Sequence, residues 1–209
     1  MIQLRRDGFV ADREEVERLR TQFENSNWVR LPGLLDPQLF SLVLSCIERS
    51  RWRDHKQPGF FSEYTLETGA AAELLHFVTN APKFLATVGD ITGFSAFTCF
   101  RGRVYRMEPN IGHTDNWHSD AIDGRLVAMS INMAPRGYQG GLLQVRETKS
   151  HRMVAEITNI GPGDAILFRV STDFEHLVTD VLTGEAKTAF AGWFHRDAPS
   201  LRMRLRGEH

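Results

Sequence analysis

The sequence has few of the features that mark several common classes of protein. Its 2 cysteines in 209 residues, Cys46 and Cys99, lie far apart and form no CxxC pair. This excludes a disulfide framework and a cysteine-rich zinc site, and it suits a reducing compartment. No window reaches the roughly 18 apolar residues of a membrane span, and residues 1–20 contain no apolar signal core. We therefore expect a soluble, cytoplasmic protein that does not act at a membrane.

An excess of charge of one sign is missing as well. Lys and Arg number 25 against 26 Asp and Glu, so the formal net charge is −1. This balance gives no general electrostatic attraction to nucleic acid, and we expect no nucleic-acid partner. The motifs GxGxxG, GxxxxGK[ST], HExxH and GxSxG are also missing. Their absence argues against dinucleotide-binding, P-loop, zincin and α/β-hydrolase chemistry.

Helical patterns dominate the first half of the chain. Asp12 precedes apolar residues at helical spacing, and Asp36-Pro37 gives a cap and a favourable first position for a second amphipathic helix. We expect two further helices, one over residues 70–78 and a short one after Pro82. The stretch 53–68 is irregular, and we expect a loop there that covers a substrate.

Short strand patterns separated by Gly, Pro and Asn turns replace the helices after about Phe97. The expected strands cover residues 98–107, 125–133, 142–146, 153–157, 164–170, 176–181 and 188–194. Helices followed by about seven strands predict a mainly β, α+β fold, in which a sandwich or barrel is buttressed by helices. We expect one domain over 1–209, with a mainly helical support region (1–96), a β core (97–196) and a basic C-terminal tail (197–209).

One stretch of eight residues, 113–120, contains two HxD pairs, His113/Asp115 and His118/Asp120. In an extended segment residues i and i+2 point to the same side, so either pair offers an imidazole and a carboxylate to one ion. His176, in a later strand, is the candidate third ligand. Two His and one carboxylate on one face of an octahedral ion leave three positions open, an arrangement typical of non-haem Fe(II) oxygenases.

The order of several short motifs gives a more specific signal. From Tyr105 to Arg196 the sequence resembles the 2-oxoglutarate- and Fe(II)-dependent dioxygenase superfamily, most closely its prolyl 4-hydroxylase-like branch. The resemblance is carried by HSD (118–120), RLVAMSIN (125–132), YQGGLL (138–143), GDAILF (163–168), HLVTDV (176–181), GEAK (184–187) and GWF (192–194). The resemblance implies a double-stranded β-helix, the cupin-like jelly roll, with helices against its outer sheet.

The resemblance also implies a role for particular residues. His118, Asp120 and His176 match the catalytic iron ligands, and this spacing favours His118/Asp120 over His113/Asp115. Lys187 lies six residues before Trp193 and eleven after His176, one more than the common spacing. It matches the basic residue that pairs with the distal carboxylate of 2-oxoglutarate, and burial of either charge alone would be costly.

Other residues near these motifs are assigned less specifically. Asn132 stands where an inward polar residue contacts the co-substrate, or else satisfies nearby backbone. Trp117 is expected to give His118 an apolar flank, and Tyr64 and Tyr105 lie at the active-site mouth or in the core. Arg125 and Arg146 either bind an anionic substrate group or form structural ion pairs.

The implied activity is hydroxylation of a C–H bond with Fe(II), 2-oxoglutarate and O2, releasing succinate and CO2. The substrate is a small molecule, or a side chain of a peptide or protein. Two alternatives remain: a jelly-roll metalloprotein with a different reaction, and a catalytically silent binding protein. The oligomeric state is not predicted.

Overall fold

The computed structural model describes residues 1–95, 97–122, 124–158 and 161–196. The four expected helices are confirmed: α1 (Arg13–Ser26), α2 (Pro37–Glu48), α3 (Ala70–Thr79) and α4 (Pro82–Thr92). Asp12 and Asp36 cap the first two, because their carboxylates accept the backbone N–H groups of Glu15 and Leu39. The C-terminal tail expected at 197–209 lies outside the described residues.

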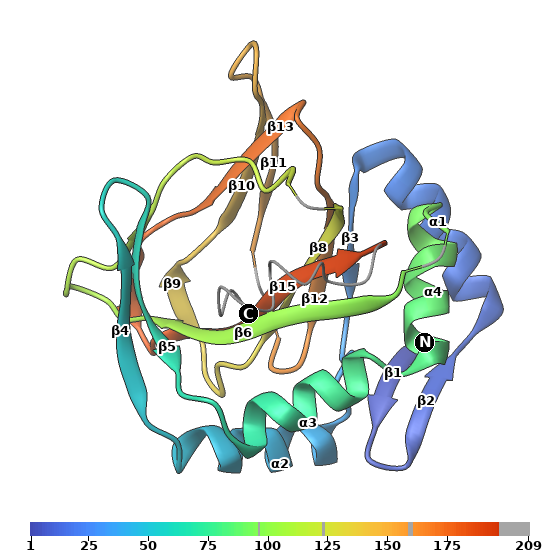
Figure 1. Cartoon of the computed structure of the whole chain (residues 1–209), viewed down its shortest axis with the longest axis horizontal. Helices are drawn as coiled ribbons and strands as arrows, with labels where there is room; N and C mark the ends of the chain where they lie inside the picture. Colours follow the sequence, from blue (N-terminus) through green and yellow to red (C-terminus); the bar gives the residue numbers. More distant parts are fainter. Residues whose placement is uncertain (96, 123, 159–160, 197–209) are drawn as a thin grey trace.

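A large antiparallel sheet forms the centre of the molecule (Figure 1). Its strand order is β3 (Trp28–Leu31), β12 (Ala165–Arg169), β8 (Arg125–Asn132), β15 (Lys187–His195), β6 (Cys99–Met107), β5 (Phe61–Leu66) and β4 (Trp52–Gln57), with β7 (Thr114–Asp115) paired to β5. The strands expected near residues 98, 125, 164 and 188 are confirmed. The strand pattern was expected after about Phe97, and the structure adds β3, β4 and β5 from the mainly helical first half to this sheet.

Smaller antiparallel sheets face the large one. One has the order β11 (Met153–Ile157), β10 (Leu143–Glu147), β13 (Phe174–Val178), and the other pairs β14 (Val181–Gly184) with β9 (Tyr138–Gly140). Val145 and Ile157 from the small sheet pack in one buried cluster with Ala128 and Phe168 from the large sheet. Two antiparallel sheets packed in this way form the expected double-stranded β-helix.

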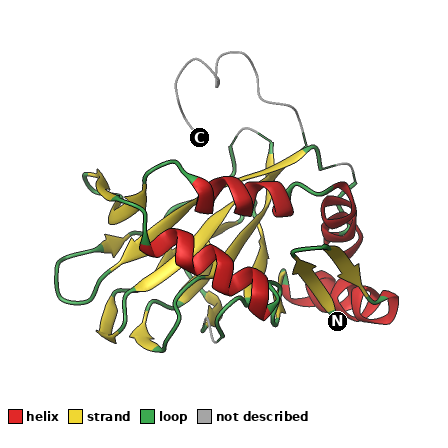
Figure 2. Cartoon of the chain, turned by 90° about the horizontal axis from the view of Figure 1, so that it is seen from below, coloured by secondary structure: helices red, strands yellow, loops and turns green. Residues whose placement is uncertain are grey.

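The helices cover the opposite face of the large sheet. Val127, Met129 and Ile131 on β8 join the buried cluster that contains the apolar faces of the helices. Ala128, between them, points to the small sheets. Both faces of β8 are therefore buried, which explains its nearly continuous apolar sequence. Figure 2 shows two helices lying across the strands of this sheet. A hairpin of β1 (Ile2–Arg5) and β2 (Gly8–Ala11) lies beside them.

Two segments differ from the expected pattern. The irregular loop expected over 53–68 is wrong, because the segment is the hairpin β4–β5, paired from Trp52↔Leu66 to Gln57↔Phe61. β4 is an edge strand with little buried surface, so its residues are mostly polar. Its sequence therefore lacks the alternation of apolar and polar residues that predicts a strand. The strand expected over 176–181 is divided, with β13 ending at Val178 and β14 beginning at Val181.

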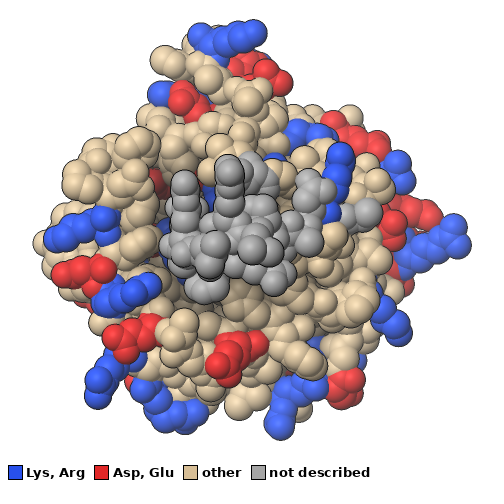
Figure 3. All heavy atoms as spheres, viewed as in Figure 1, with Lys and Arg blue, Asp and Glu red and all other residues tan. Residues whose placement is uncertain are grey.

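Acidic and basic side chains are interspersed around the face shown in Figure 3. Within the described residues, no helix is long and apolar enough to cross a bilayer.

Candidate metal centre and co-substrate pocket

His118, Asp120 and His176 come together where the segment before β8 crosses β13. His118 and His176 form an isolated antiparallel bridge, and the backbone N–H of each donates to the carbonyl of the other, with N···O distances of 3.1 and 2.9 Å. One ligand atom from each of the three side chains lies within 4.8 Å of the other two. In the described part of the chain, this is the one group of His, Cys, Asp or Glu side chains close enough to hold a metal ion.

The ring of His118 is oriented by contacts to its Nδ1, the ring nitrogen that points away from the candidate metal position. Its Nδ1 lies 2.7 Å from the carbonyl oxygen of Asn116, which can only accept, so Nδ1 carries the proton. The Nε2 lone pair is then free for a metal, and this atom lies 3.8 Å from Asp120 Oδ1. Asp115 Oδ1 lies 3.5 Å from the same Nδ1, and Asp115 Oδ2 accepts the backbone N–H of Val178 at 2.8 Å. Asp115 therefore ties the loop that carries His118 to β13.

Asp120 is held by two residues outside the triad. Trp193 Nε1 donates to Asp120 Oδ2 at 2.7 Å, and Arg125 Nη1 lies 3.5 Å from Asp120 Oδ1. Burial would raise the pKa of Asp120, but the hydrogen bond and charge of His176, the charge of His118 and the Trp193 hydrogen bond lower it to about 2. The carboxylate is therefore ionised at neutral pH and ready to bind a cation.

His176 projects from β13 toward this carboxylate. Its Nε2 lies 3.3 Å from Asp120 Oδ2, and its ring packs edge-on against Phe168, with centroids 5.0 Å apart. The phenyl ring buttresses the imidazole from the interior of the barrel.

The two arginines left open in the sequence both form ion pairs. Arg125 pairs with Asp120 and stacks over Trp193 at 3.7 Å. Arg146 Nε donates to Glu175 at 2.6 Å, and its guanidinium lies 3.9 Å from the centre of the Trp117 ring. Trp117 is thus stacked on a cation, a contact that the apolar-flank prediction did not include.

The rival first ligand, His113, lies apart from the triad. Its Nδ1 accepts the backbone N–H of Glu108 at 2.9 Å, and its ring packs edge-on against Tyr64 at 4.6 Å. Burial lowers the pKa of His113, partly offset by nearby acidic residues such as Glu108. The structure therefore separates the two HxD pairs: Asp115 lies behind His118, and His113 helps to pack the preceding loop.

Lys187, at the start of β15, is buried with a relative exposure of 2%. Its Nζ donates to the carbonyl of Gly141 at 2.9 Å and lies 3.5 Å from the hydroxyl of Tyr138. No carboxylate among the described residues forms an ion pair with it. Burial lowers the pKa of Lys187 to about 8, although the charge of Asp115 acts in the other direction. A buried ammonium group in this state is suited to an anionic ligand.

Tyr138 belongs to this pocket, although the sequence indicated it only as part of a motif. Burial raises its pKa, so the hydroxyl remains a neutral donor beside Lys187. The sequence Tyr-Gln-Gly-Gly (138–141) was a weak signal for a binding residue, because the strand β9 that positions Tyr138 was not expected. Tyr105, predicted for the mouth or the core, is buried in the same apolar cluster as Tyr138.

Asn132 uses its side-chain amide on the backbone. Nδ2 donates to the carbonyl of Gly161 at 3.0 Å, and Oδ1 accepts the N–H of Ala134 at 3.0 Å. Asn132 and Tyr138 also line a hollow of about 380 Å³. Contact of Asn132 with a co-substrate stays a prediction.

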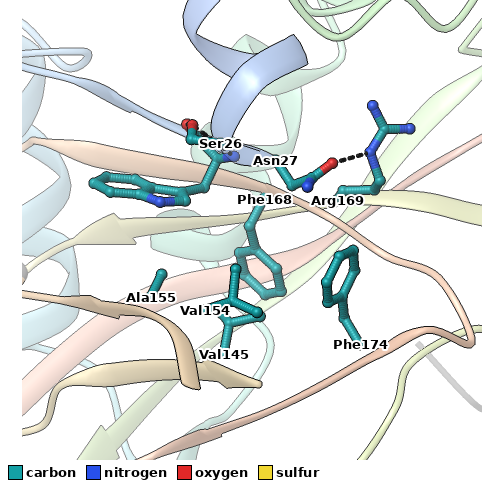
Figure 4. Close-up of a pocket in the computed structure, with 9 residues that line it drawn as sticks. Ser26, Asn27, Val145, Val154, Ala155, Phe168, Arg169 and Phe174 are labelled. Atoms are coloured by element: carbon teal, nitrogen blue, oxygen red, sulfur yellow. Dashed lines mark hydrogen bonds between the residues drawn. The ribbon is translucent and has the colours of Figure 1, made fainter. Parts of the chain in front are cut away.

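The barrel interior between β12 and the β10–β11 hairpin is filled by side chains. Figure 4 shows a pocket there surrounded by Val145, Phe168 and Phe174, with Arg169 bonded to Asn27 beside it. Its volume is only about 10 Å³, near the minimum for one water molecule. This pocket is too small to hold a substrate.

The donor set fits a particular kind of metal. Two imidazoles and one carboxylate that converge from one side define the facial triad of non-haem Fe(II) oxygenases. The thiol-free set of nitrogen and oxygen donors suits iron, and the buried Lys187 with Tyr138 suits a dicarboxylate co-substrate in the same barrel.

Comparison with known families agrees with this class. Residues 102–195, from β6 to the end of β15, match the 2OG-Fe(II) oxygenase superfamily. This part of the chain thus matches a superfamily whose typical cofactor and co-substrate are Fe(II) and 2-oxoglutarate.

Solved structures share the fold. An oxidoreductase of the 2OG-Fe(II) oxygenase family from Burkholderia pseudomallei is 16% identical with a TM-score of 0.71, covering 97% of this chain and 99% of that one. A Pseudomonas putida prolyl-4-hydroxylase is 15% identical with a TM-score of 0.64, covering 88% and 100%. The epimerase SnoN, in complex with Fe3+, alpha ketoglutarate and nogalamycin RO, is 12% identical with a TM-score of 0.60, covering 88% and 84%. Comparison with curated proteins finds no match.

Proposed function

We propose that this protein is an Fe(II)- and 2-oxoglutarate-dependent dioxygenase that hydroxylates a C–H bond of a small molecule or of a peptide or protein side chain. Succinate and CO2 are the products of the co-substrate. The observation that carries the proposal is the convergence of His118, Asp120 and His176 in a barrel that also holds the buried Lys187, which has no carboxylate partner among the described residues.

Each of these residues has a distinct task. His118 Nε2, His176 Nε2 and one oxygen of Asp120 hold the ion from one side. Lys187 Nζ and the Tyr138 hydroxyl hold the distal carboxylate of 2-oxoglutarate. When bound, Fe(II) activates O2 and couples decarboxylation of 2-oxoglutarate to oxidation of the substrate. The filled interior behind His176 directs the substrate to the other side of the triad.

The relatives indicate two substrate classes. One is a prolyl-4-hydroxylase, and SnoN was solved with nogalamycin RO, a small molecule. SnoN is an epimerase, so a similar fold accommodates an outcome other than hydroxylation. We infer hydroxylation here from the prolyl 4-hydroxylase-like motifs that surround the triad.

The test is formation of succinate from 2-oxoglutarate by protein reconstituted with Fe(II), with and without a panel of small molecules and peptides. We expect turnover that requires both Fe(II) and 2-oxoglutarate and that His118→Ala or His176→Ala abolishes. His151→Ala is the matched control, because His151 is exposed and lies outside the triad. Hydroxylation is then read as a gain of one oxygen atom in the product by mass spectrometry.

Two results contradict the proposal. Tight binding of Zn without any decarboxylation across the panel would indicate a different metalloprotein or a binding protein. Turnover with a product of unchanged mass would indicate a different oxidative outcome at the same site.

A further inference from the structure

The strand β6 presents a row of side chains to the barrel interior beside the triad. Phe100 and Val104 pack in the cluster formed with the helices. Because successive residues of a strand point to opposite faces, Arg101, Arg103 and Tyr105 face the interior. Two guanidinium groups therefore lie on the inner face of the sheet, one step apart.

Arg101 is the member of this row nearest the metal centre. It lies directly opposite Trp193 in the β6–β15 pair, and such neighbours on one face have Cβ atoms roughly 5 Å apart. The indole of Trp193 in turn donates to Asp120 at 2.7 Å. Arg101 is thus separated from a metal-binding carboxylate by a single side chain.

Two glycines fix the register at this point. Gly102 and Gly192 lie opposite each other, and a Cβ on Gly192 would overlap the carbonyl oxygen of Arg101. A Cβ on Gly102 would lie 2.7 Å from the carbonyl oxygen of Ala191. The two strands therefore approach closely where Arg101 and Trp193 are placed, so the position of Arg101 is set by the sheet.

Arg101 differs from Arg103 and Arg125 in having no hydrogen-bond or ion-pair partner among the residues that the structure describes. Arg103 donates through Nε and Nη2 to Glu63 Oε1 at 2.9 and 2.7 Å, and Arg125 lies 3.5 Å from Asp120. Nη2 of Arg101 is buried with no hydrogen-bond partner, and no described carboxylate forms an ion pair with this residue. A buried guanidinium nitrogen without an acceptor is costly, which is typical of a site that awaits an anion.

Lys187 does not share this task. It lies opposite Met107, at the other end of the β6–β15 pair, six residues from Trp193. The two cationic positions are therefore separated by roughly 20 Å along the strand. Ala191 lies opposite Arg103 on the same face, between the positions of Lys187 and Arg101. Its small side chain fills little of the space between these two positions. This separation favours one anion at Lys187 and a different one at Arg101.

We propose that Arg101 binds a carboxylate of the substrate and so determines its class: an acid that is held by its carboxylate while its oxidised carbon faces the metal. The inference rests on the proposed function, because it takes the anion at Lys187 to be 2-oxoglutarate. A planar guanidinium binds a carboxylate with two parallel hydrogen bonds, which fixes orientation as well as affinity. A free carboxylic acid and an Asp or Glu side chain of a peptide offer the same group.

The test compares acids with their matched amides. Protein loaded with Mn(II) and 2-oxoglutarate without O2 is screened by thermal shift against free amino and hydroxy acids and against peptides containing Asp or Glu. Each probe is paired with its primary carboxamide. We expect acids from one of the two sets to bind in preference to their amides. The set that binds identifies the source of the carboxylate.

Variants then locate the effect. Calorimetric titration of the best acid should show a loss of roughly 10- to 100-fold in Arg101→Gln, with partial recovery in Arg101→Lys. Arg20→Gln, on the exposed face of α1, is the control for loss of a positive charge. The acid-against-amide comparison in the unaltered protein keeps the proposal testable if Arg101→Gln fails to fold.

Three results would overturn the inference. One is equal binding of acids and amides, or binding of neither. Another is unchanged acid affinity in Arg101→Gln. The last is a loss in this variant that falls on 2-oxoglutarate, which would place Arg101 in the co-substrate site. Acid binding without any decarboxylation of 2-oxoglutarate under O2 would instead refute the proposed function and leave the anion site in place.

Discussion

The three candidate metal ligands, His118, Asp120 and His176, are each oriented by a contact outside the triad. The Asn116 carbonyl sets the protonated nitrogen of His118, Trp193 and Arg125 hold the two oxygens of Asp120, and Phe168 packs against the ring of His176. Such outer contacts determine ligand orientation and basicity. The site is therefore organised before a metal binds, because its donor atoms are held by the protein.

The Trp193 indole provides a specific test of this organisation. Trp193→Phe removes the N–H donor to Asp120 and keeps a ring for Arg125 to stack on. We expect affinity for Mn(II) to fall about tenfold, since the carboxylate loses one of its orienting partners. Calorimetric titration measures it, with Trp52→Phe as the control, because Trp52 stacks on Arg106 on the outer side of the sheet. Equal affinities in the two variants would contradict the role given to Trp193.

The buried ammonium group predicts a pH dependence of co-substrate binding. Burial lowers the pKa of Lys187 to about 8, so the free site loses its positive charge as the pH rises through this value. The dissociation constant of 2-oxoglutarate should be constant below about pH 7.5 and rise above pH 8, toward tenfold per pH unit.

Lys187→Arg is the matched variant for this measurement, because Arg stays charged throughout the range. Its dissociation constant for 2-oxoglutarate should not depend on pH between 7 and 9.5, whatever its absolute value. A rise above pH 8 that persists in Lys187→Arg would place the titrating group elsewhere.

At the scale of elements, the sequence predicted those helices and strands whose formation depends on neighbouring residues in the chain. The capped amphipathic helices and the apolar strands of the large sheet were confirmed, because caps and periodic apolar faces are written in consecutive residues. The β4–β5 hairpin was missed, since its polar strands are defined by pairing with β6, far away in the sequence. The division of 176–181 into β13 and β14 also depends on two different partner strands.

The candidate site shows the same limit. Spacing alone left two equivalent HxD pairs, and the resemblance selected His118/Asp120, which the structure brings to His176. Sequence reasoning did not identify three residues of the candidate sites: Tyr138, Trp193 as a donor to Asp120, and Arg101, whose Nη2 has no hydrogen-bond partner among the described residues. Their roles depend on which strands are neighbours, and that information appears only in the folded sheet.

The close approach of β6 and β15 gives a prediction at this scale. Gly192→Ala should lower the free energy of unfolding by at least about 2 kcal/mol, because the added methyl group overlaps the backbone of Arg101. Urea unfolding measures the change. Gly137→Ala is the control, since a Cβ there meets no atom within 4 Å. Equal unfolding midpoints for the two variants would show that the strands separate at little cost.

At the scale of the whole molecule, one buried cluster joins the helices to the outer face of the large sheet. The candidate metal ligands and Lys187 lie on the other face, between the two sheets. The same strands therefore pack against the helices on one face and carry the candidate site residues on the other. In β15, Phe190 and Phe194 pack with the helices. Lys187 and Trp193 face the barrel.

Binding of the metal and 2-oxoglutarate should therefore stabilise the fold even when no substrate is present. Each ligand present at 100 times its dissociation constant adds about 2.7 kcal/mol. We expect Mn(II) and 2-oxoglutarate, both at this excess, to raise the melting temperature by roughly 10–20 °C. A chelator should reverse the shift, and Asp120→Ala should not show it. A shift of equal size in Asp120→Ala would mean that the metal binds elsewhere.

The most direct test of the metal and co-substrate sites is a crystal structure of the protein with Mn(II) and 2-oxoglutarate, with the metal located by its anomalous signal. We predict one anomalous peak among His118 Nε2, His176 Nε2 and an oxygen of Asp120, with the distal carboxylate of 2-oxoglutarate on Lys187 and Tyr138. A peak at His113 and Asp115, or 2-oxoglutarate bound away from Lys187, would contradict this prediction.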